Sequence, residues 1–136
     1  MGAHETVSVP GNAAGVHQAI DAFEAWSDGQ GVPVEARQRL LTSIDEVLSN
    51  VVHHGLQGQA GEIDLVFSRR GGVIAIEVSD GAAPFNPLLA PAPDTTAPLE
   101  LRQVGGLGIA LVRALVDDVC YERREDRNHL TIIWKL

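Results

Sequence analysis

Residues 40–55 of this 136-residue chain read LLTSIDEVLSNVVHHG. Apolar side chains recur here at steps of three and four residues, which predicts an amphipathic helix with one buried stripe: Leu40, Ile44, Val47, Leu48 and Val51. Pro33 suits the first turn of that helix, and Gly55 and Gly58 end it. Such a stripe is buried against a second layer of secondary structure, which the rest of the chain supplies.

The segments before and after this helix alternate between helix and strand patterns. Ile63, Leu65 and Phe67 alternate with polar residues, which is typical of a half-buried strand. Arg70-Gly71-Gly72 predicts a tight turn, so two neighbouring strands form a hairpin. The other predicted elements are a strand over 6–9, a helix from an Asn12 cap to about Trp26, strands over 62–68 and 73–79, and a last hairpin over 119–123 and 129–135.

The third predicted helix follows a proline-rich loop. Five of the seven prolines lie between Pro84 and Pro98, which excludes a helix or a central strand there. The segment Gly105-Gly106-Leu107-Gly108 then opens a helix that Asp117 closes, with a predicted buried stripe of Leu107, Leu111, Ala114 and Leu115. The whole pattern predicts one domain over 1–136, an α/β (α+β) two-layer sandwich with three main helices on one face of a mixed, mostly antiparallel sheet.

Composition limits the function classes. Hydrophobic residues make up 45% of the chain and charged residues 21%, an ordinary globular balance. Ten basic against eighteen acidic residues give a net charge of -8, which argues against direct binding of nucleic acid. Cys120 is the only cysteine, which excludes an internal disulfide and favours the reducing cytosol. No apolar run approaches the roughly 20 residues that span a membrane.

Glu46 and Asn50 form the first candidate site. They are four residues apart on the predicted helix, so they share a face at the edge of the apolar stripe. A carboxylate there suits a general base, and an amide oxygen suits a hard cation, but a plain surface pair has the same spacing. His53 and His54 invite a metal hypothesis, which their divergent directions on a helix disfavour.

Two further candidates follow in the second half of the chain. Asp80-Gly81 ends a strand, where a carboxylate can accept a hydrogen bond from an exocyclic amine and a glycine lets a ligand approach. The glycines of 105–108 at a helix start suit an anion. Each pattern also has a plain structural interpretation, an Asp-Gly turn and a glycine-rich loop end. The loop between them suits either a lid over a ligand or a linker.

The order of these pieces resembles the GHKL ATP-binding superfamily, also called the histidine-kinase-like ATPase fold. Residues 46–55 are similar to its N box, 78–87 to its G1 box and 105–112 to its G2 box. Within the superfamily the chain looks like the small anti-sigma factor serine/threonine kinases of bacteria, down to the tail pattern Asp117-x-Val119-x-Tyr121-x-Arg123 and Asn128-x-Leu130. The resemblance covers nearly the whole chain.

The resemblance implies a role for each matching residue. Glu46 is implied as the catalytic general base, Asn50 as the holder of Mg²⁺ against the phosphates of ATP, and Asp80 as the reader of the adenine amino group. Gly106 and Gly108 are implied to let the helix start meet the phosphates, beneath a lid over 83–104. The further nucleotide contacts implied are His54, Ala82, Phe85, Gly105, Leu107 and Thr131.

The chain departs from the family pattern in three places. Ala82 stands where the G1 box usually has its glycine, and Asn86 where aspartate is frequent. Thr131 is the one candidate for the threonine of the last box. The predicted lid is also poor in lysine and arginine, which weakens its grip on phosphate.

Two functions from different classes follow. The resemblance implies an ATP- and Mg²⁺-dependent protein serine/threonine kinase in the cytoplasm, without membrane or nucleic-acid contact. It implies phosphorylation of a STAS-type anti-sigma factor antagonist, sequestration of a sigma factor, and a homodimer. The alternative is a non-catalytic regulatory module that binds a nucleotide or a partner. A sensor histidine kinase is disfavoured, because it would add a dimerisation helix to this length.

Overall fold

The computed structural model describes residues 2–57, 59–89 and 106–136, with only the main chain of residues 2 and 106–108. The elements in chain order are β1 (Gly2–Pro10), α1 (Ala13–Gly29), α2 (Val34–Asn50), the π-helical turn η1 (Val51–Gly55), β2 (Glu62–Arg70), β3 (Val73–Asp80), the 3₁₀ turn η2 (Pro87–Leu89), α3 (Gly106–Leu115), β4 (Asp118–Arg124) and β5 (Arg127–Lys135).

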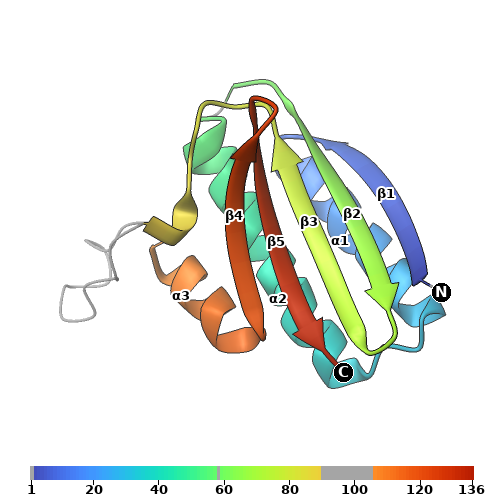
Figure 1. The fold of residues 1–136 in the computed structure, drawn as a ribbon. Helices are drawn as coiled ribbons and strands as arrows, with labels where there is room; N and C mark the ends of the chain where they lie inside the picture. The colour runs from blue at the N-terminus through green and yellow to red at the C-terminus, as the bar shows by residue number, and fades with distance from the viewer. Residues whose placement is uncertain (1, 58, 90–105) are drawn as a thin grey trace.

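The five strands form one sheet in the order β1-β2-β3-β5-β4. All four strand pairs are antiparallel, so the sheet is more uniform than the mixed sheet expected from the sequence. Helices α1, α2 and α3 lie together on one face of the sheet (Figure 1). This arrangement confirms the predicted two-layer sandwich. No helix in the described part of the chain is long and apolar enough to span a membrane.

The core lies between the helices and the inner face of the sheet. Ile63, Leu65 and Phe67 alternate along β2 and are fully buried, as the period of two predicted. Phe67 packs edge-on against Phe23 of α1, with 5.2 Å between ring centroids. The predicted stripe of α2 is buried as expected, from Leu40 to Val51.

The predicted cap of the first helix is also confirmed. The Asn12 side chain accepts a hydrogen bond from the Gly15 N–H at 3.0 Å. The helix itself is longer than expected, because α1 runs on to Gly29.

The predicted stripe of α3 is wrong in its described part, because Ile109 and Val112 are buried while Leu111 is 41% exposed. This helix is apolar on more than one side, so periodicity alone did not decide which side meets α2 and the sheet.

Candidate active site

The helix face that carries Glu46 and Asn50 ends at a change of helix type. Asn50 is the last residue of α2, and η1 continues from it as a π-helical turn. The Leu56 N–H donates to the Val51 carbonyl oxygen at 2.7 Å, the five-residue spacing of such a turn. Turns of this type are rare and frequently mark functional sites. The π-helical turn therefore begins directly after Asn50.

Asn50 is a buried polar residue with an unpaired donor. Its side chain is 4% exposed, and its Nδ2 atom has no hydrogen-bond partner among the residues that the structure describes. An unpaired buried amide costs about 1–3 kcal/mol of stability. Few such groups occur in native structures, and a binding role is one of the explanations for them. The plain surface-pair interpretation of Glu46 and Asn50 does not fit this burial.

Glu46 lies one helical turn before Asn50 and is half-buried. Burial raises the pKa of its carboxyl above the usual 4.5, and the neighbouring charge of Asp45 adds to the increase. A carboxylate with a raised pKa is a better proton acceptor near neutral pH than an ordinary one. The environment of Glu46 therefore suits a general base.

Asp80 ends β3 and points to the helix side of the sheet. The residue is 3% exposed, and its Oδ1 atom accepts hydrogen bonds from the Ala82 N–H and the Asn128 amide, both at 3.0 Å. Both bonds reach the same oxygen, so Oδ2 takes part in neither. The carboxylate is therefore held in a fixed orientation with one oxygen outside these two bonds.

A narrow slot joins Asp80 to the end of α2. It holds about 20 Å³, which is room for about one water. Its walls come from α2, η1, β3, β4, β5 and the segment after β3: Val47, Val51, Val78, Asp80, Phe85, Pro87, Tyr121, Asn128 and Leu130. An apolar slot with a buried carboxylate at one end suits a flat polar ring, once its walls separate.

Phe85 lines this slot, and the His54 ring lies beside the Phe85 ring. Their ring centroids are 6.1 Å apart, and a Cβ added to Gly55 would lie 3.7 Å from the Phe85 ring. The Phe85 N–H donates to Asn128 Oδ1 at 3.1 Å, which ties the phenylalanine to β5. The structure thus brings Phe85 together with Asp80 in the slot, and His54 reaches this group through its ring contact with Phe85.

Ala82 fits its position without backbone strain. Among the described residues, positive φ in non-glycine residues occurs at Gln57, Glu125 and Asp126, and not at Ala82. Its carbonyl oxygen accepts a hydrogen bond from Arg123 Nη1 at 2.8 Å. The departure from the usual glycine therefore does not distort the segment that follows Asp80.

Thr131 is not brought to the slot. It pairs with Glu77 and Cys120 on neighbouring strands, and alternation along β5 places it on the face that the helices leave uncovered. Leu130, one residue earlier, lines the slot instead. Thr131, the residue chosen from the sequence, therefore does not line the slot, because neighbouring residues of a strand face opposite sides of the sheet.

Asn128 and Tyr121 are site residues that the motif reasoning did not select. Asn128 lies directly opposite Asp80 in the β3–β5 pairing. The family-like tail pattern contained both residues, but the position of Asn128 beside Asp80 follows only from the strand register. That register was not accessible from the sequence.

The glycine-rich segment is described only in part. Residues 106–108 form the first turn of α3, as predicted, but their side chains, Gly105 and most of the predicted lid (90–104) lie outside the described residues. Helix α3 packs beside α2, so the two helices lie on the same side of the sheet (Figure 1).

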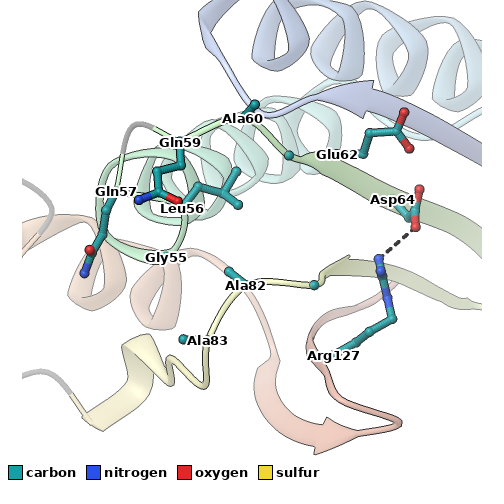
Figure 2. Close-up of a pocket in the computed structure, with 12 residues that line it drawn as sticks. Gly55, Leu56, Gln57, Gln59, Ala60, Glu62, Asp64, Ala82, Ala83 and Arg127 are labelled. Atoms are coloured by element: carbon teal, nitrogen blue, oxygen red, sulfur yellow. Dashed lines mark hydrogen bonds and ion pairs between the residues drawn. The ribbon is translucent and has the colours of Figure 1, made fainter.

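A second, wider cleft adjoins the slot. It holds about 480 Å³ and lies between the segment after η1 and residues 81–83 (Figure 2). Asp64 and Arg127 form an ion pair of 2.8 Å across its far end. Asp80 does not line this cleft; its carboxylate lines the narrow slot instead.

The side chains of the site are compatible with Mg²⁺ only if phosphates and water supply most of its ligands. No group of three or more acidic, histidine or cysteine side chains gathers in the described part of the chain. Mg²⁺ is usually held by one or two protein oxygens together with phosphates and water. A single amide oxygen, from the buried Asn50 side chain, fits that mode of binding.

Comparison with known protein families places the chain among the nucleotide-binding domains. Residues 9–134 match the histidine kinase-like ATPase domain, so the chain belongs to that family, which binds ATP. A solved structure of the RsbU and RsbW domains of Rv1364c from Mycobacterium tuberculosis matches 98% of this chain with a TM-score of 0.70. At 16% identity, and over 32% of that longer chain, this match shows the fold alone.

Curated relatives carry the names of protein kinases. The chain is 31% identical over 97 residues to the serine/threonine-protein kinase BtrW of Bordetella bronchiseptica, a match over 71% of this chain and 68% of the relative. It is 29–30% identical to the serine-protein kinases RsbW of Bacillus mycoides and Listeria monocytogenes, over 65% of this chain. The chain matches only 58–60% of the length of the two RsbW proteins.

Proposed function

We propose that this protein is an ATP-dependent protein serine/threonine kinase of the anti-sigma factor type. The observation that carries the proposal is the slot that joins the buried Asp80 carboxylate to the end of α2, where the buried Asn50 Nδ2 atom has no partner among the described residues. Membership of the histidine kinase-like ATPase family and the kinase names of the relatives support it.

Each residue contributes a separate part of the reaction. Asp80 accepts a hydrogen bond from the adenine amino group, and Phe85 lies against the base. Asn50 would hold Mg²⁺, which would neutralise charge on the phosphates. Glu46 accepts the proton of the substrate serine hydroxyl, and its raised pKa supports that task. Phosphoryl transfer depends mainly on positioning and charge neutralisation, so few side chains are needed.

The remaining contacts come from the start of α3 and the segment over 83–104. The helix N-terminus offers backbone N–H groups to the phosphates. The proline-rich segment acts as the lid over ATP. Its scarcity of basic residues leaves the contacts to phosphate largely to α3 and the metal ion.

The protein substrate and the regulatory partner follow from the family resemblance. We propose that the kinase phosphorylates a serine of a STAS-type anti-sigma factor antagonist and, in the alternate state, binds a sigma factor. It acts in the cytoplasm as a homodimer. The strongly acidic balance of the chain favours basic surfaces on its partners.

A non-catalytic binding module is the second candidate, and the small slot favours it. At about 20 Å³ the slot accepts a base only after Phe85 or its neighbours move. If that opening does not occur, the domain binds partners without ATP.

Phosphoryl transfer to a purified STAS-type antagonist tests the first candidate. The antagonist is incubated with Mg-ATP and the kinase, and phosphoserine is detected by mass spectrometry. Transfer by the wild type, and its loss in Glu46→Gln with nucleotide binding retained, supports the kinase. Nucleotide binding without transfer to any antagonist favours the regulatory module instead.

A further inference from the structure

Asn128 connects its own strand, β5, to three other segments that meet at the slot. It is 5% exposed, and its Nδ2 atom donates to Asp80 Oδ1 and to the Ala83 carbonyl oxygen, both at 3.0 Å. Its Oδ1 atom accepts hydrogen bonds from the Phe85 N–H and the Tyr121 hydroxyl. One side chain therefore links β3, β4, β5 and the segment after β3.

These contacts fix which oxygen of Asp80 remains for a ligand. The Ala82 N–H and the Asn128 amide both donate to Oδ1, and neither bond uses Oδ2. A carboxylate held by two donors keeps its orientation, so its second oxygen is a preorganised acceptor. An exocyclic amine pairs with such an acceptor, whereas a carbonyl at the same place is repelled.

The inner face of β5 explains why an asparagine has this task. Leu130 occupies the slot position two residues later and has no polar atom in its side chain, while Thr131 faces the other side of the sheet. Among the described residues of β5, Asn128 is the one whose side chain donates to Asp80. Loss of its amide would leave a single donor on the carboxylate.

We infer that Asn128 is a positioning residue that makes the slot select a 6-amino purine over a 6-oxo purine. It acts through Asp80 and through the main chain of residues 83–85. The inference rests on the proposed nucleotide site and adds a determinant of base selectivity to it.

The test measures the ratio of the dissociation constants for GTP and ATP instead of a single affinity. Mg-ATP and Mg-GTP are titrated by calorimetry into the wild type, Asn128→Asp and Asn128→Ala. Asn128→Asp keeps an oxygen for Phe85 and Tyr121 but has no amide donor when it is ionised. Thr131→Ala is the matched control, because it changes the same strand on the opposite face.

Both Asn128 variants are expected to lower the ratio of the GTP to the ATP dissociation constant by about tenfold or more, the size of one hydrogen bond to a charged group. Thr131→Ala should leave the ratio within about twofold. Circular dichroism establishes that each variant is folded, and Asn128→Ala carries the test if the buried charge of Asn128→Asp prevents folding.

The other outcomes separate this inference from the proposed function. If the variants weaken ATP and GTP equally, Asn128 only supports the structure and the inference is overturned, while the nucleotide site stands. If the wild type binds neither nucleotide, the proposed function fails, and base selection by Asn128 fails with it.

Discussion

Replacement of Asn50 by leucine is expected to make the protein more stable and unable to use Mg-ATP. The Asn50 side chain is buried at the end of α2, and its Nδ2 atom lacks a partner in the described part of the chain. Leucine resembles asparagine in branching and has no polar side-chain atom, so it removes the unpaired donor.

The expected size follows from the cost of the unpaired amide. Such a group costs about 1–3 kcal/mol, which Asn50→Leu recovers where the larger side chain is accommodated. An unfolding entropy of about 2.1 cal/mol/K per residue gives about 0.29 kcal/mol/K for 136 residues. The midpoint of thermal unfolding should therefore rise by about 3–10 °C.

The assay is calorimetric unfolding with and without Mg-ATP. The wild type should gain stability from the nucleotide through linkage, whereas Asn50→Leu should start from a higher midpoint and gain nothing. Ser43→Ala is the control on the same helix, because Ser43 is buried but donates to the Arg39 carbonyl oxygen at 2.8 Å. A lower midpoint for Asn50→Leu, or an undiminished response to Mg-ATP, would refute the reasoning.

Four further predictions concern catalysis and the fold. Glu46→Gln should lower the rate of transfer by about 10²–10⁴-fold with little change in nucleotide affinity. The pKa of Glu46 is raised, and the base acts in its deprotonated form, so the wild-type rate should fall on acidification at a higher pH than it would for an ordinary glutamate. The rate is measured in single turnovers, and a rate independent of pH between 4 and 7 would contradict this prediction. Gly15→Ala should destabilise the fold by about 1–3 kcal/mol or more in urea unfolding, because a Cβ there would overlap a main-chain oxygen of β1. Gly29 has open space around it, so Gly29→Ala should raise the free energy of unfolding by about 0.4–1 kcal/mol. Val112→Ala should cost about 1.6 kcal/mol or more from two lost methylene equivalents, and Leu111→Ala less than about 0.5 kcal/mol; equal costs in the same unfolding assay would restore the stripe first expected for α3.

The elements of the fold were accessible from the sequence because their signals are local. The alternation from Ile63 to Phe67 and the three- and four-residue steps of α2 each lie within one segment, and Asn12 caps the helix that it begins. The same holds for the Glu46–Asn50 pair, whose spacing is a property of one helix. The order of these segments then supported the two-layer sandwich.

Features that depend on contacts between segments were less accessible. Thr131 was selected as the one candidate for the threonine of the last box, but alternation along β5 places it on the sheet face opposite the slot. The hydrogen bond between Asn128 and Asp80 joins residues that are 48 positions apart in the sequence. Helix α3 was assigned the wrong buried side because more than one of its sides is apolar, and only packing against α2 distinguishes them.

Calorimetric titration of Mg-ATP into the wild type and into Asp80→Asn tests the central claim most directly. The account predicts saturable binding by the wild type and a loss of about tenfold or more in Asp80→Asn, because the buried carboxylate is the acceptor for the base. Equal affinities for the two proteins, or no binding by the wild type, would contradict it.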